Sequence, residues 1–199
     1  MPKEALIACN DREVEAGAQP KLTIELVPQT CWFSNVRKQV SDKDWNRIRS
    51  QVYEQADRRC EVCGGQGTRH PVECHEVWEY DEAAEVQRLV RMIALCPACH
   101  EVKHIGLAEV RGRADLAQAH LAEVNGWTAE LAARYVNEAF DTWRRRSSRT
   151  WSLDISALGT YGIDPAIIAD TSATSADDRA QEVASVTAQR AQGERQPPR

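Results

Sequence analysis

Three short stretches decide the fold: RCEVCGG at residues 59–65, VECHEVWEYDE at 72–82 and IALCPACHEVKHIG at 93–106. The first and the last each hold a C-x-x-C pair. A gap of two residues lets both sulfurs of a pair reach one ion, and zinc prefers four tetrahedral ligands. Four thiolates leave no open coordination position, so the spacing predicts a structural zinc site that also supplies folding free energy. Its ligands are Cys60, Cys63, Cys96 and Cys99.

The remaining cysteines and the start of the chain favour a metal site over a disulfide framework. Of the seven cysteines, we expect Cys9, Cys31 and Cys74 to be small buried side chains or free thiols. The N-terminal residues lack an apolar stretch followed by a cleavage site, which predicts a cytoplasmic protein without a secretory signal. No apolar run approaches the roughly 20 residues of a membrane helix, so we expect no membrane partner.

Four of the five histidines lie between positions 70 and 104. His100 and His104 are four residues apart, which places both on one face of a helix, where they can bind one divalent cation. His100 directly follows Cys99, so the zinc site would orient that helix, and His75 lies on a strand that the same site brings alongside. Such a cation stabilises charge on a phosphoryl oxygen, and a neutral imidazole accepts a proton from water. We therefore predict His100 and His104 as ligands of a catalytic ion and His75 as the general base.

Strands are predicted from alternation of apolar and polar residues. KLTIELVP at 21–28 reads as a short strand, and residues 70–78 as another. A short partner for the second strand is expected at 93–95. Between them, the spacing of apolar residues does not distinguish a loop from a helical turn over 80–91, so both interpretations stay open.

Helices are predicted from capping residues and from apolar spacing. Ser41 followed by Asp44 resembles a capping box, which predicts a helix ending near residue 58. Pro97 suits a first helical turn, because its missing N–H costs nothing there. Thr128 caps a longer amphipathic helix. The other expected elements are a helix over 97–105, a helix over 114–124 closed by Asn125 and Gly126, and an extended piece with a turn within 151–168.

Five segments follow from these patterns. Residues 1–20 form a flexible arm and 21–58 an N-terminal strand and helix. Residues 59–106 form the metal-binding core, and 107–169 form a helical extension that packs around it. Residues 170–199 contain Ala, Ser, Thr, Gln and charge without an aromatic residue, so we expect a disordered tail.

The charge balance bears on nucleic-acid binding. Apolar residues make up 42% of the chain and charged residues 28%, which suits a globular core, and the formal net charge is −5. A negative balance disfavours phosphate contact, which needs Lys and Arg. Two basic clusters, one within 37–59 and one of Arg144, Arg145, Arg146 and Arg149, either face a phosphate backbone or are solvated helix faces.

The three quoted stretches resemble the HNH, or ββα-metal (His-Me finger), endonuclease superfamily. The resemblance implies an α+β fold in which a ββα-metal finger, stapled by the four-cysteine zinc site, is surrounded by α-helices. It implies hydrolysis of DNA phosphodiester bonds, by nicking or by double-strand cleavage. The general base then falls on His75. The catalytic ion, which is Mg²⁺, Mn²⁺, Ni²⁺ or Zn²⁺ in such enzymes, falls on His100 and His104.

Two positions depart from the family pattern. The residue before the base, often Asp or His in the family, is here Cys74, a softer ligand that favours zinc-like ions. The third ligand of the catalytic ion therefore stays open among Glu73, Cys74, Glu76 and Asp81. The motif's central Asn also has no counterpart, because no Asn lies between Asn46 and Asn125.

Two other functions stay open at this point. One is a catalytically inactive zinc-stapled binding module, which the acidic balance and the missing Asn favour. The other is a nuclease acting on RNA, since such a site reads phosphate and not base identity. DNA is the expected partner, and the helical extension and the tail are where a protein partner would bind. Trp32, Trp45 and Trp78 either stack on nucleobases or pack in the core, and core packing is the preferred interpretation.

Overall fold

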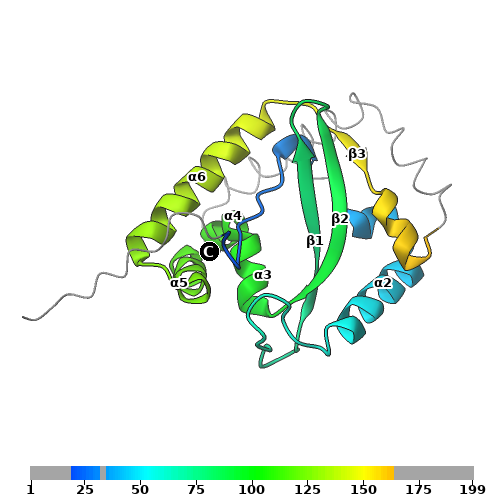
Figure 1. Ribbon diagram of the computed structural model, residues 1–199, viewed down its shortest axis with the longest axis horizontal. Helices are drawn as coiled ribbons and strands as arrows, with labels where there is room; N and C mark the ends of the chain where they lie inside the picture. Colours follow the sequence, from blue (N-terminus) through cyan, green and yellow to red (C-terminus); the bar gives the residue numbers. More distant parts are fainter. Residues whose placement is uncertain (1–18, 32–34, 164–199) are drawn as a thin grey trace, which may run out of the picture.

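The computed structural model describes residues 19–31 and 35–163, and its fold is α+β (Figure 1). The predicted tail at 170–199, nearly all of the predicted arm, Cys9 and Trp32 lie outside the described residues. The elements in chain order are η1 (Gln29–Cys31), α1 (Val36–Gln39), α2 (Asp42–Gln55), β1 (Glu73–Asp81), β2 (Val86–Leu95), α3 (Pro97–Lys103), α4 (Ile105–Val110), α5 (Ala114–Asn125), α6 (Ala129–Ser147), β3 (Ser152–Asp154) and η2 (Ser156–Tyr161).

A β1–β2 hairpin forms the centre of the molecule. The strands pair antiparallel from Glu73 opposite Leu95 to Asp81 opposite Val86, with a bulge between Val77 and Trp78. The short β3 pairs parallel to β2 and completes a sheet of order β1-β2-β3. Figure 1 shows α3 to α6 on one side of this hairpin and α2, β3 and η2 on the other.

The hairpin is longer than the sequence patterns predict. The first strand starts at Glu73, and the second begins at Val86, so most of 80–91 belongs to the sheet. Asp81 closes the turn, since its Oδ1 accepts hydrogen bonds from the backbone N–H groups of Ala83 and Ala84. The physical reason lies in residues 86–91 of β2. This part buries the polar Gln87 and leaves Val90 48% exposed, so apolar residues do not mark its buried face.

The predicted helix caps are present. Ser41 Oγ accepts a hydrogen bond from Asp44 N at 3.1 Å, and Thr128 Oγ1 accepts one from Leu131 N at 3.2 Å. Pro97 opens α3, and Gly126 ends α5 in the left-handed conformation with φ 67°. The predicted helix ends at 58 and 105 come earlier, at Gln55 and Lys103. Within the described ranges, no helix combines the length and apolarity that crossing a membrane requires.

The predicted strand at 21–28 is wrong, because this extended segment joins no sheet. Its backbone bonds to helices instead. Leu22 exchanges two hydrogen bonds with the Asn125 side chain at the end of α5. Glu25 N donates to the Lys103 carbonyl of α3, and the Val27 carbonyl accepts from Trp143 Nε1 of α6. The alternation therefore reflects a segment held between helices, with Leu22 fully buried.

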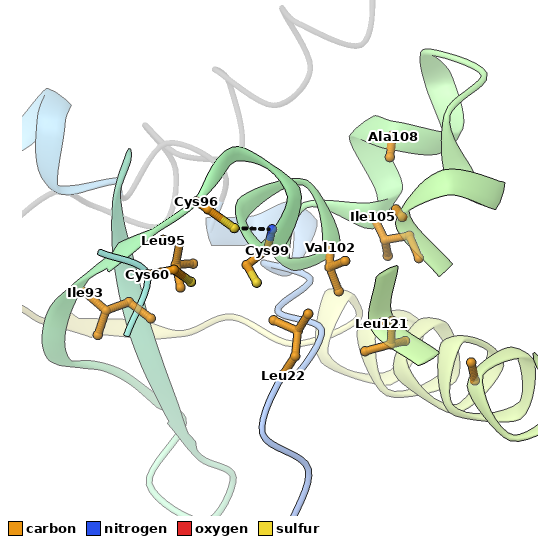
Figure 2. Close-up of a cluster of buried hydrophobic side chains, with 12 residues drawn as sticks. Leu22, Cys60, Ile93, Leu95, Cys96, Cys99, Val102, Ile105, Ala108 and Leu121 are labelled. Atoms are coloured by element: carbon orange, nitrogen blue, oxygen red, sulfur yellow. Dashed lines mark hydrogen bonds between the residues drawn. The ribbon is translucent and has the colours of Figure 1, made fainter. Parts of the chain in front are cut away.

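Two apolar cores lie on the two sides of the hairpin. The first joins Leu22, Leu95, Cys60, Cys96, Cys99, Val102, Ile105 and Leu121, and Figure 2 shows these side chains around α3. The second core joins β2 to α2 and η2. Its buried members include Val36, Ile48, Val52, Leu89, Met92, Ile155 and Leu158, and Trp45 and Trp78 pack against it. The hairpin thus packs against an apolar core on each side, which fixes the position of the residues on β1.

Candidate metal centres

The four motif cysteines form one cluster. Their sulfur atoms all lie within 4.8 Å of one another, and Cys63 Sγ is 3.6 Å from Cys96 Sγ. Tetrahedral Zn–S bonds of about 2.3 Å place sulfurs about 3.8 Å apart, so the spacing suits a structural ion such as zinc. Cys60 and Cys63 lie in the loop between α2 and β1. Cys96 caps α3, where its Sγ accepts from Cys99 N at 3.5 Å (Figure 2).

The pKa shifts of the clustered thiols show that a bound cation would stabilise their ionised forms. The Cys99 side chain donates a hydrogen bond to Cys60, which lowers the pKa of Cys60 to about 4. Burial, together with the charge on Cys60, raises the pKa of Cys96 to about 11. The same bond and burial raise the pKa of Cys99. The first thiolate therefore opposes the ionisation of its neighbours, and a soft dication is what allows four thiolates to coexist.

His120 contacts this cluster. Its Nε2 lies 3.2 Å from Cys99 Sγ, and its Nδ1 lies 3.7 Å from Glu123 Oε2. An N–H donated to a thiolate reduces the charge on the sulfur and holds its orientation. No sequence spacing links His120 to the cysteine motifs, because α5 reaches them only through packing against α3.

Replacing His120 with phenylalanine is expected to weaken zinc retention by about 10- to 100-fold, since partners of metal ligands contribute on that scale. Competition with a chromogenic chelator measures the zinc affinity. Gln118→Ala on the same helix is the control and should leave affinity unchanged. Equal zinc affinity in the His120→Phe variant and the unmodified protein would contradict a role for this ring.

Three imidazoles form a second cluster. Ring centroids lie 5.2 Å apart for His75 and His100, 5.0 Å for His75 and His104, and 4.6 Å for His100 and His104. One ring nitrogen from each falls within 4.8 Å of the others. The predicted meeting of the strand histidine with the helical pair is therefore present. The cysteine cluster lies at the start of the helix that carries His100, because Cys96 and Cys99 fall in its first turn.

The hydrogen bonds around these rings leave a lone pair on His100 Nε2, which faces the His104 ring. His100 Nδ1 contacts Glu73 Oε2, while Glu73 Oε1 lies 2.6 Å from His70 Nε2. A carboxylate only accepts, so neutral His100 carries its proton on Nδ1 and has a lone pair on Nε2. That Nε2 lies 3.2 Å from His104 Nε2. A carboxylate behind an imidazole is the arrangement that orients histidine ligands of metals.

Burial keeps the helical rings neutral. Burial, with the nearby His75, lowers the pKa of His100. Burial, with the nearby His75 and His100, lowers the pKa of His104 to about 3. Neutral imidazoles are the form that binds metal, and nitrogen donors suit zinc, nickel, copper or iron. The residues present therefore fit a divalent ion of this class.

None of the four side chains left open as a third ligand belongs to this cluster. Cys74 packs with the second core, and burial raises its pKa to about 12. Asp81 closes the hairpin turn. Glu76 Oε1 accepts a hydrogen bond from Val36 N at 2.7 Å. Glu73 lies behind His100 and so acts on the cluster through that ring.

Sequence reasoning missed a carboxylate at His75. Glu25 Oε2 lies 3.2 Å from His75 Nε2, and Glu25 Oε1 lies 2.5 Å from Lys103 Nζ. Lys103 is only 4% exposed, and its Nζ also donates to Thr23 Oγ1 at 2.6 Å. Predicting a strand at 21–28 concealed this role. The available signal was a lysine placed inside the H-x-x-x-H stretch, where a buried cation needs an acidic partner.

His104 lines two open cavities and His100 lines the larger of them, whereas His75 lines neither of the two. The larger cavity, of about 750 Å³, has a basic rim; its ionisable lining residues are Arg69, His70, Glu73, His100, Glu101, His104, Arg111 and Arg113. The other, of about 620 Å³, has Trp78, Phe140 and Trp143 among its lining residues. A bound molecule can therefore reach the rings of His100 and His104.

The predicted basic cluster at the end of α6 and just after it is partly neutralised within the protein. Arg144 pairs with Asp141, and Arg146 and Arg149 pair with Glu82 at 3.1 and 3.5 Å. Arg146 also lies over the Tyr80 ring. The arginines that line a cavity with the imidazoles are Arg69, Arg111 and Arg113, of which Arg113 pairs with Glu101.

Comparison of the chain with protein-family models, with curated proteins and with solved structures finds no match. What the chain does is therefore inferred from the chemistry of its own side chains.

Proposed function

We propose that the chain is a metal-dependent HNH-type endonuclease that hydrolyses DNA phosphodiester bonds. The observation that carries this proposal is the meeting of three imidazoles beside an open cavity, on a hairpin and helix that the cysteine cluster ties together. The order of hairpin β1–β2 followed by α3 is the order of a ββα-metal finger. Three histidines whose ring nitrogens all lie within 4.8 Å of one another are an arrangement that a divalent ion explains.

The proposed roles follow from the ring environments. His100 and His104 hold a divalent ion, which supplies charge stabilisation for a phosphoryl oxygen and the leaving oxygen. His75 is 5% exposed and takes the proton from the attacking water as general base. Glu73 orients His100 from behind and holds its proton on Nδ1. The cysteine cluster takes no part in the reaction and positions the reacting groups.

The basic rim of the larger cavity supports a phosphate-backbone substrate. Arg69 and Arg111 line the cavity that holds His100 and His104. Contacts of this kind bind phosphate regardless of sequence. We therefore propose that these two arginines contact the DNA phosphates on either side of the scissile bond.

Removing both charges, Arg69→Gln with Arg111→Gln, is expected to weaken DNA binding and to flatten its salt dependence. Losing two phosphate contacts reduces the slope of log affinity against log salt by about 1.8. Fluorescence anisotropy of a labelled duplex, measured without added catalytic metal, gives this slope. Arg144→Gln with Arg145→Gln on α6 is the matched control and should change the slope less. Equal slopes in the two double variants would contradict the proposal that the DNA backbone contacts Arg69 and Arg111.

The test of the proposed function is cleavage of supercoiled plasmid with Mg²⁺, Mn²⁺, Ni²⁺ or Zn²⁺. Nicking by the unmodified protein, reduced roughly 10²- to 10⁴-fold in His75→Ala, is the expected result. Binding without cleavage under every metal would instead indicate a zinc-stapled binding module. Cleavage of RNA in preference to DNA would redirect the assignment to RNA.

A further inference from the structure

We infer that Glu25 is the positioning residue of His75: its carboxylate fixes the tautomer and orientation of that ring, and Lys103 fixes the carboxylate. This inference rests on the proposed function, since it assigns a role at the same site. It brings into the site an extended segment that lies outside the cysteine and histidine motifs.

The contacts form a chain of buried polar groups. Each oxygen of Glu25 has its own partner, with Oε2 3.2 Å from His75 Nε2 and Oε1 2.5 Å from Lys103 Nζ. Lys103 Nζ in turn donates to Thr23 Oγ1. The side chains of His75 and Lys103 are each 5% exposed, and that of Glu25 is 18% exposed. A side chain held at both oxygens has little freedom to rotate.

The backbone fixes the same arrangement independently. Glu25 N donates to the carbonyl of Lys103 at 3.2 Å, so the two residues are tied by main chain as well as by charge. Leu22 anchors the segment in the first core, and Trp143 holds it at Val27. The carboxylate is therefore presented to His75 by a segment attached at several points.

The charge state of Glu25 determines what His75 can do. Burial would raise the pKa of Glu25, but the hydrogen bond with His75 and the charge of Lys103 outweigh it, so the pKa lies below its usual value. An ionised carboxylate only accepts, so neutral His75 carries its proton on Nε2. Its Nδ1 is then the nitrogen with a free lone pair. Glu25, 50 positions away in the sequence, thus sets the His75 tautomer that a base or a ligand needs.

Glu25→Gln gives a sharp test, because an amide has one oxygen and one NH₂ group. The Lys103 ammonium requires the oxygen, so the NH₂ group is left facing His75 Nε2. The ring must then accept at Nε2 and carry its proton on Nδ1. This wrong tautomer should lower kcat by on the order of 10³-fold or more while KM changes little, as expected when an orienting carboxylate becomes an amide. Glu25→Asp keeps two acceptor oxygens and should keep the Nε2–H tautomer and part of the activity.

The experiment uses the full chain with zinc at the cysteine site. Long-range ¹⁵N–¹H NMR reads the His75 tautomer, and plasmid nicking with Mn²⁺ reads kcat and KM. Glu138→Gln is the control, because Glu138 lines a cavity with Glu25 and is exposed. Thermal unfolding establishes that each variant folds. We expect Nε2–H in the unmodified protein and in Glu25→Asp, and Nδ1–H in Glu25→Gln.

The outcomes separate this inference from the proposed function. An unchanged His75 tautomer in Glu25→Gln, or Nδ1–H in the unmodified protein, overturns the role of Glu25 even if the protein nicks plasmid. Absence of nicking by the unmodified protein counts against the nuclease proposal, while the NMR result still decides whether Glu25 positions His75.

Discussion

Replacing Cys99 with serine is expected to abolish both zinc binding and cooperative unfolding. Cys99 is fully buried in the first core and belongs to the four-sulfur cluster. A structural zinc site contributes about 10–16 kcal/mol of apparent binding free energy. The free energy of unfolding of a whole domain is only roughly 5–15 kcal/mol, so loss of zinc is enough to unfold it. Native mass spectrometry measures zinc content, and denaturant titration followed by near-UV circular dichroism measures cooperativity.

Cys74→Ser is the matched control for this result. Cys74 is a partly buried thiol outside the cluster, packed against the second core. We expect it to keep one zinc ion per chain and to lose about 1–3 kcal/mol of stability, because a hydroxyl enters an apolar site. Zinc retained at full affinity by Cys99→Ser, or lost from Cys74→Ser, would contradict the assignment of the ligands.

Replacing His100 or His104 with alanine is expected to remove a second, exchangeable ion and, with it, cleavage. Each change deletes a ligand, so affinity should fall by more than the roughly 10- to 100-fold that loss of a ligand's partner costs. Calorimetric titration of Ni²⁺ into protein already holding zinc at the cysteine site measures this affinity. His75→Ala should keep the ion and lose cleavage, as befits a general base.

His70→Ala is the control for the histidine series. Its side chain is half exposed and contacts the outer oxygen of Glu73, so affinity should change only slightly. An equal loss of Ni²⁺ affinity in His75→Ala and His100→Ala would make His75 a third ligand and overturn its assignment as the base. Unchanged affinity in all four variants would mean that the imidazoles bind no ion.

The parts of the structure that depend on neighbours in the chain were predictable. Ser41, Pro97, Gly126 and Thr128 act within one helical turn, so their caps follow from the sequence. The two cysteines of each C-x-x-C pair also lie close together because only two residues separate them in the sequence. Strand alternation alone would also have excluded Cys74 as a ligand beside His75, because adjacent residues of a strand point to opposite faces.

The parts that depend on tertiary packing were not predictable. Glu25 and Lys103 are 78 positions apart, and no local pattern links an extended segment to a helix end. His120 reaches Cys99 only because α5 packs against α3. The true length of β2 was hidden because its first half buries the polar Gln87 and exposes Val90, so apolar residues do not mark the buried face.

The most direct test of the central claim is a crystal structure of the protein soaked with Ni²⁺, with anomalous maps recorded at the zinc and nickel edges. We predict one zinc peak among the four cysteine sulfurs and one nickel peak bounded by the rings of His75, His100 and His104. A nickel peak elsewhere with none between these rings, or rings turned away from a common point, would contradict the account.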